Sequence, residues 1–182
     1  MKEKKHSPAA GEEWFPLVDE TGRILGKATR RVCHSGTKQL HPVVHLHVFN
    51  PSGELYLQKR PAHKDVQPGK WDTAVGGHVD YGETVESALR REALEELGLT
   101  EFVPVFIARY VFESDIEKEL VNAFMTTCTH PPTPDPEELE DGRFWSLAEI
   151  AAQLGKNVFT PNFEHEFRTF LEHRRSTLSG HS

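Results

Sequence analysis

The sequence is short of cysteine, of positive charge and of long apolar runs, and each shortage excludes a class of protein. Its 182 residues include 2 cysteines, Cys33 and Cys128, too few for the disulfide framework of a small secreted domain. Lys and Arg number 21 against 28 Asp and Glu, and the resulting net charge of -7 disfavours binding to the negatively charged backbone of a nucleic-acid polymer. No apolar run reaches the roughly 18 to 20 residues that cross a bilayer. We therefore expect a cytoplasmic protein that binds neither a nucleic-acid polymer nor a membrane.

The length predicts one domain with a short extension before it. Residues 1–12 carry charge but no apolar core and no cleavage site, so they predict a flexible tail and not a secretory signal. Residues 13–178 then form the domain. If its partner is a small molecule with phosphates, this acidic chain needs a metal ion to offset the charge.

Apolar and β-branched runs predict the strands of a mixed sheet with helices on its faces, an α+β arrangement. Residues 43–49 and 55–58 predict a hairpin in the core sheet, because Asn50, Pro51 and Gly53 supply turn chemistry between them. The other predicted strands are a hairpin over 14–18 and 23–26 and an antiparallel pair over 102–112 and 120–127. Shorter helices are predicted over 148–154 and 162–174.

One longer helix is predicted over 85–97. Thr84 is a suitable N-cap, Glu86 lies in the first turn, and Gly98 follows the last turn. At about 100° per residue, the helix places three carboxylates on one side, beside an apolar stripe that faces the sheet. The carboxylates are Glu92, Glu95 and Glu96, and the stripe is Leu89, Ala93, Leu94 and Leu97.

These glutamates have two interpretations. Alone, an E-x-x-E-E run is typical of a solvated helix face, because Glu is a good helix former. The like charges of Glu92 and Glu96 at i, i+4 nevertheless disfavour the helix unless a cation lies between them. Mg²⁺ prefers such oxygen ligands, and Gly77 in the preceding loop could bring its backbone carbonyl close to the ion.

The residues from Gly77 to Leu99 resemble the Nudix box. Gly77 is followed after five residues by Glu83, and after seven more by the run Arg91-Glu92-Ala93-Leu94-Glu95-Glu96-Leu97-Gly98-Leu99. The resemblance implies an α/β/α sandwich around a mixed sheet, and hydrolysis of a diphosphate linkage in a nucleoside diphosphate derivative or a related organic diphosphate. It implies Mg²⁺, with Mn²⁺ as a second choice, on Glu92, Glu95 and Glu96. It also implies a structural pair between Arg91 and Glu83.

Segments outside the box resemble the isopentenyl-diphosphate isomerase branch of that family, among them residues 18–20, 28–30 and 68–72. This resemblance implies a second metal site at His34, His41, His78, Glu117 and Glu119. It also implies diphosphate-binding cations at Arg30, Arg60 and Lys64. Taken singly, such histidines are usually surface or satisfied core residues, and the cations are equally typical of a solvated basic loop.

The isomerase branch has its catalytic cysteine two residues before the loop histidine, where this chain has Gly76. Without that thiol, isomerisation lacks one of its two acid/base groups, so hydrolysis is the favoured activity and isomerisation the alternative. A non-catalytic sensor is disfavoured because the box glutamates are complete. As general base we expect Glu119 or Glu117 before the Glu137–Glu138 pair. The sequence is compatible with both a monomer and a homodimer.

Overall fold

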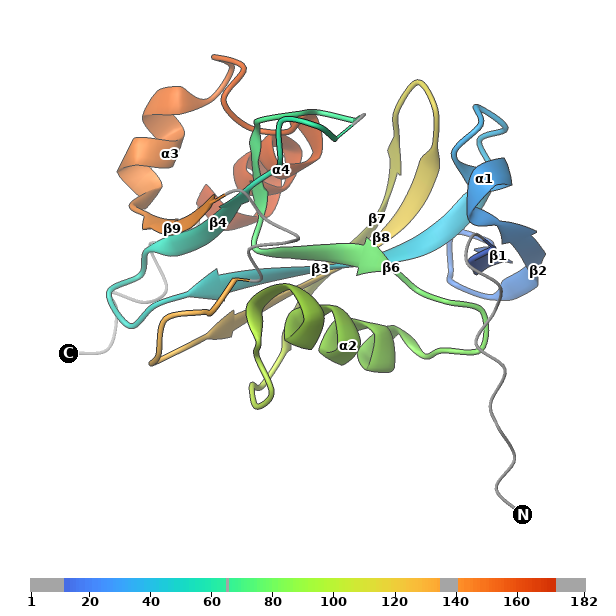
Figure 1. The fold of residues 1–182 in the computed structure, drawn as a ribbon, viewed down its shortest axis with the longest axis horizontal. Helices are drawn as coiled ribbons and strands as arrows, with labels where there is room; N and C mark the ends of the chain where they lie inside the picture. The colour runs from blue at the N-terminus through green and yellow to red at the C-terminus, as the bar shows by residue number, and fades with distance from the viewer. Residues whose placement is uncertain (1–11, 65, 135–140, 173–182) are drawn as a thin grey trace.

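A mixed β-sheet crosses the middle of the molecule, with helices on both of its faces (Figure 1). The structure, a computed structural model, describes residues 12–64, 66–134 and 141–172. The predicted tail up to residue 11, the end of the predicted domain and the Glu137–Glu138 pair lie outside these ranges. The strands are β1 (Trp14–Val18), β2 (Ile24–Thr29), β3 (Leu40–Phe49), β4 (Leu55–Lys59), β5 (Trp71–Thr73), β6 (Val75–His78), β7 (Val105–Glu113), β8 (Lys118–Thr127) and β9 (Asp141–Trp145). The helices are α1 (Arg30–Cys33), α2 (Val85–Leu97), α3 (Leu147–Gln153), α4 (Pro161–Glu166) and the π-helical η1 (Phe167–Leu171).

The strand β3 is central to the sheet, whose order is β5-β4-β3-β8-β7. It runs parallel to β8 over its whole length and pairs antiparallel with β4 and with β6. The β7 and β8 strands pair antiparallel, as predicted. The mixed sheet and the α+β class expected from the sequence are therefore confirmed.

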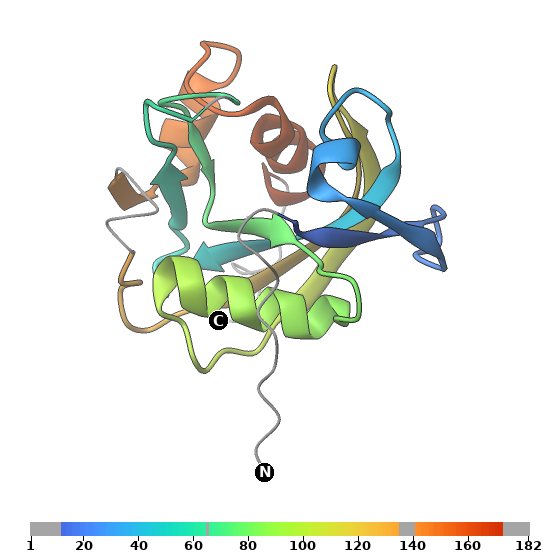
Figure 2. The same ribbon diagram turned by 45° about the vertical axis from the view of Figure 1, so that its right-hand side comes forward.

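The two faces of β3 have different neighbours. Val44, Leu46 and Val48 belong to a buried cluster with Leu89 and Ala93 of α2. On the other side of the sheet, a second cluster packs beneath α3, α4 and η1, which lie together in Figure 2. These two apolar layers make the sandwich.

The predicted apolar stripe of α2 was wrong at one position, because Leu94 is 52% exposed. It lies about 140° around the helix from Leu89, beyond the side that the sheet covers. The stripe therefore consists of Leu89, Ala93 and Leu97, together with Ala88.

Local signals account for both ends of α2, and the predicted bounds are confirmed. The Thr84 hydroxyl accepts a hydrogen bond from the Ser87 amide at 3.1 Å, and the Ser87 hydroxyl accepts one from the Thr84 amide at 3.1 Å. Gly98 ends the helix with a left-handed φ of 63°, a conformation that glycine adopts without strain.

Other boundaries moved for identifiable reasons. The strand predicted from residue 102 begins at Val105, because Pro104 before it has no amide hydrogen for a sheet ladder. The second arm of the first hairpin extends to Thr29. The last predicted helix divides into α4 and η1, and its final two residues lie outside the described ranges. None of the described helices is long and apolar enough to span a membrane.

Candidate active site

The loop between β6 and α2 is fastened to the helix by Arg91. Its Nε donates to Glu83 Oε1 at 2.8 Å and its Nη2 donates to Glu83 Oε2 at 2.9 Å, the two-pronged geometry in which arginine binds a carboxylate best. Nη2 also donates to the His78 carbonyl at 3.0 Å. The structure thus brings Arg91 and Glu83 together and fixes the loop that enters α2.

Gly77 lies directly against Glu92. A Cβ atom built on Gly77 would overlap the Glu92 carboxylate, so no other residue fits here without moving that side chain. Gly77 pairs with Val44 of the central strand, which holds its backbone in place. The bare backbone of β6 and the carboxylate of α2 therefore form one wall of the site.

The three box glutamates are placed differently. The Glu92 side chain is 14% exposed, whereas that of Glu95 is 55% exposed. Glu96 accepts a hydrogen bond from Gln58 Nε2 at 2.9 Å. Burial, reinforced by the charge of Glu92, raises the pKa of Glu96 to about 8. A cation bound here would offset that unfavourable crowding of negative charge.

Gln58 is a contributor that the sequence analysis missed. It is 8% exposed in β4, and its Nε2 also donates to the Ala74 carbonyl at 3.2 Å. The sequence signal for it was a polar amide side chain, Gln58, directly after the apolar Leu57 in a predicted core strand. A buried polar side chain usually has a specific partner, and here the partner is Glu96.

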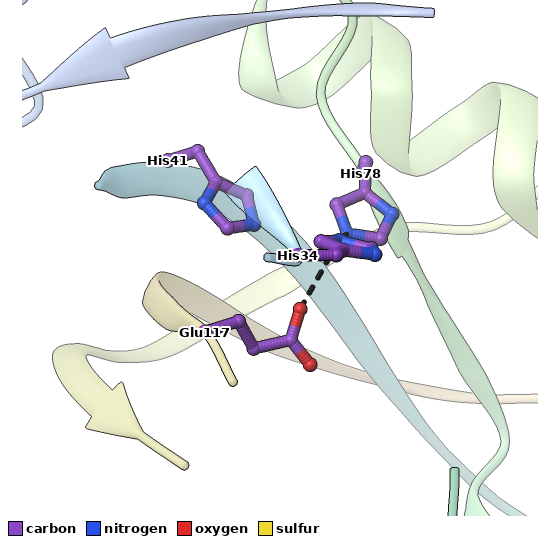
Figure 3. Close-up of side chains that lie close together, drawn as sticks. All are labelled: His34, His41, His78 and Glu117. Atoms are coloured by element: carbon purple, nitrogen blue, oxygen red, sulfur yellow. Dashed lines mark hydrogen bonds and ion pairs between the residues drawn. The ribbon is translucent and has the colours of Figure 1, made fainter. Parts of the chain in front are cut away.

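A second group of side chains, drawn from four separate parts of the chain, converges beside the first (Figure 3). His34 follows α1, His41 is in β3, His78 ends β6, and Glu117 precedes β8. One ligand atom from each lies within 4.8 Å of the others. Glu119, predicted in this set, is not a member of this group among the described residues. It lines the adjoining cavity together with Glu117.

The histidines of this group have the electronic state that metal ligands need. Burial lowers the pKa of His34 to about 4, and it also lowers the pKa values of His41 and His78, so the rings are neutral at pH 7. His41 Nδ1 lies 2.9 Å from the Gln39 carbonyl and donates to it. The buried His41 Nε2 has no hydrogen-bond partner in the described part of the chain. Its lone pair therefore faces the group, as in a metal-binding histidine.

Two neighbouring cavities meet between these groups. The three box glutamates line one, and His34, Glu117 and Glu119 line the other. Of the predicted substrate cations, Arg30 and Arg60 line both cavities, and Lys64 lines the glutamate cavity. Arg60 Nη1 is 3.3 Å from Asp72 Oδ2, and Arg30 Nη1 is 2.8 Å from Glu13 Oε2. The residues that line both cavities are Arg30, His45, Arg60, Asp72, Gly76, Gly77 and His78.

Comparison with known proteins gives three kinds of similarity. A family model described as the NUDIX domain matches residues 39–166. An isopentenyl-diphosphate Delta-isomerase of Streptomyces griseus subsp. griseus is 33% identical over 156 residues, covering 81% of this chain and 78% of that protein. An uncharacterised Nudix hydrolase of Listeria monocytogenes is 32% identical over 155 residues, covering 84% of this chain and 90% of that protein. The crystal structure of DR0079 from Deinococcus radiodurans has a TM-score of 0.74 at 24% identity, covers 86% of this chain and 98% of that one, and supports the fold.

Proposed function

We propose that this chain, which belongs to the Nudix family, is a diphosphohydrolase that cleaves the diphosphate linkage of a small organic diphosphate with the help of Mg²⁺. The substrate class is a nucleoside diphosphate derivative or a related organic diphosphate. The observation that carries the proposal is the contact of the Glu92 carboxylate with the bare backbone of Gly77, beside the half-buried Glu96. Glu92, Glu95, Glu96 and the Gly77 carbonyl offer the hard oxygen ligands that Mg²⁺ or Mn²⁺ prefers.

The side chains around the cavities divide the remaining work. A divalent ion on the glutamates would polarise the phosphoryl group and offset the charge that develops on it. Arg30, Arg60 and Lys64 line the cavity of the glutamates, and we propose that they bind non-bridging phosphate oxygens. Holding the reacting groups and neutralising their charge is the greater part of catalysis in phosphoryl transfer.

As general base we propose Glu119. Glu117 is 3.1 Å from His34 Nε2 and is therefore committed to the histidine group. Glu119 is half-buried and lines the same cavity, and desolvation together with the charge of Glu117 raises its pKa to about 8. A base whose pKa lies near the working pH accepts a proton from water most effectively.

For His34, His41, His78 and Glu117 we propose a second metal site. The unpartnered His41 Nε2 supports it, because a buried nitrogen lone pair without a partner is costly unless it binds a cation. Three imidazoles and one carboxylate favour a transition-metal ion such as Mn²⁺ over Mg²⁺. Metal analysis of purified H41A against the wild type tests this, and equal Mn²⁺ content in both proteins would contradict it.

The hydrolase proposal is tested with E95Q and E96Q. We expect each to lower turnover about 100-fold or more, because a catalytic metal supplies several kcal/mol of transition-state stabilisation. The assay is a Mg²⁺-dependent screen of nucleoside triphosphates, dinucleoside polyphosphates, nucleotide sugars and isoprenoid diphosphates. E86Q is the matched control, because Glu86 lies on the same helix and pairs with Arg90 on the surface. Wild-type turnover by E95Q and E96Q would refute the proposal.

Isomerisation of isopentenyl diphosphate is the second candidate, favoured by the identity to the Streptomyces protein. Gly76 opposes it, because no thiol stands at that position. Incubation of the protein with isopentenyl diphosphate in deuterated water distinguishes the two activities. Deuterium in recovered substrate or product supports isomerisation, and phosphate release without exchange supports hydrolysis.

A further inference from the structure

His45 stands where the two cavities meet. It lies in β3 and pairs with Gly76 of β6, and its side chain is 12% exposed. It lines both the cavity of the box glutamates and the cavity of Glu117 and Glu119. His45 belongs neither to the box glutamates nor to the group of His34, His41, His78 and Glu117.

The Nδ1 edge of the His45 ring is bound by Glu166. Its Nδ1 is 2.8 Å from Oε1 of Glu166, a fully buried carboxylate. The Tyr110 hydroxyl donates to the same oxygen at 2.6 Å, and His47 Nε2 binds Glu166 Oε2. Because Glu166 Oε1 is bound by both His45 and Tyr110, this oxygen sets the orientation of the imidazole, whereas His47 binds the other oxygen.

The other edge of the ring is open. A Cβ atom on Gly76 would lie 3.6 Å from His45 Cδ2 and 3.7 Å from His45 Nε2, so the glycine leaves this edge uncovered. Within the described residues the ring hydrogen-bonds only through Nδ1. Nε2 is therefore the atom left for a ligand.

The charges around His45 favour a donor at Nε2. Burial lowers its pKa, but the adjacent Glu166 outweighs burial, and with Glu119 and Asp72 it raises the pKa to about 9. His78 also faces this position and is neutral at pH 7. With both ring nitrogens protonated, Nε2 presents an N–H to the cavity.

We propose that His45 binds a phosphoryl oxygen of the substrate through Nε2, between the two metal groups; this rests on the proposed diphosphate hydrolysis. Arg30 and Arg60 line both cavities as well, and each also contacts a carboxylate, Arg60 that of Asp72 and Arg30 that of Glu13. A diphosphate that spans both cavities therefore meets His45 as a further cationic donor, on the central strand β3.

His47 provides a matched control. It lies two residues further along the same face of β3, binds the same Glu166 and is 1% exposed. It lines neither of the two cavities. H47Q therefore perturbs the buried network without removing the proposed phosphate contact.

The test measures binding of methylene diphosphonate, a diphosphate that is not hydrolysed, to wild type, H45Q and H47Q by calorimetry with Mg²⁺. We expect H45Q to weaken binding about tenfold or more, as loss of one hydrogen bond to a charged group does, and H47Q to stay near wild type. In ¹⁵N-histidine spectra of the wild type, the Nε2 resonance of His45 should shift on binding. Equal affinities of H45Q and H47Q, or an unmoved Nε2 resonance, would overturn the assignment.

A second variant covers the case in which H45Q does not fold. G76A keeps His45 and places a methyl group at ordinary contact distance over Nε2, so it should weaken methylene diphosphonate binding in a folded protein. Unchanged binding by G76A would overturn the assignment. Binding by the wild type without hydrolysis of any diphosphate in the screen would refute the proposed function and leave the His45 assignment standing. Hydrolysis that H45Q performs as well as wild type refutes only the assignment.

Discussion

At the scale of single residues, Gly77 joins the backbone of β6 to the proposed Mg²⁺ site. The Glu92 carboxylate occupies the space of a Cβ atom at this residue. G77A should therefore displace Glu92, lower the free energy of unfolding by about 1–3 kcal/mol and weaken Mg²⁺ binding. Denaturant unfolding and calorimetric Mg²⁺ titration measure the two effects.

Gly26 in β2 is the control for this substitution. A Cβ atom there has nothing within 4 Å, so G26A should leave both Mg²⁺ affinity and stability near wild type. If G77A binds Mg²⁺ as the wild type does, Glu92 is not a ligand of the ion.

At the scale of elements, the β1–β2 hairpin covers the histidine group. Phe15 is fully buried and stacks on the His78 ring, with the ring centroids 4.4 Å apart and the planes at 2°. The amide of Tyr81 donates to the Trp14 carbonyl at 2.8 Å and fastens the hairpin to the loop before α2. The hairpin thus keeps water from the histidines, which contributes to their lowered pKa values.

F15A should lower the free energy of unfolding by about 3–5 kcal/mol, the range for loss of a buried phenyl ring. It should also raise the pKa of His78 toward its ordinary value, because water reaches the ring. Histidine NMR titration and denaturant unfolding are the measurements. W14A is the control, since Trp14 is 40% exposed on the same strand. A His78 pKa in F15A equal to that in W14A would contradict the covering role.

At the scale of the whole molecule, the half-buried ionisable groups predict how stability depends on pH in the metal-free protein. Glu96 and Glu119 have pKa values of about 8 in the fold against an ordinary 4.5, so the folded state binds more protons and stability falls from about pH 5 to pH 8. His34 has a pKa of about 4 in the fold against an ordinary 6.5, so the unfolded state binds more protons in this range. Stability is therefore lost as the pH falls from about 6.5 to about 4. Because these trends oppose each other, the metal-free protein should be most stable at mildly acidic pH.

Added Mg²⁺ should stabilise the protein more at pH 8 than at pH 6, because carboxylate ligands must lose their protons to bind it. Thermal unfolding across pH, with EDTA or with Mg²⁺, measures this. E96Q should flatten the decline toward pH 8. A metal-free protein that becomes more stable from pH 6 to pH 8 would contradict the raised carboxyl pKa values.

The sequence by itself determined the features that depend on near neighbours. The bounds of α2 follow from Thr84 and Gly98, and the shared side of Glu92 and Glu96 follows from helical periodicity. The tertiary structure decided which distant residues meet. His45 and Glu166 are 121 residues apart in sequence and bind through the packing of α4 on β3. The prediction that Leu94 is buried was wrong for the same reason. Helical spacing places a residue on a face of the helix, and only the packed sheet decides how wide the buried face is.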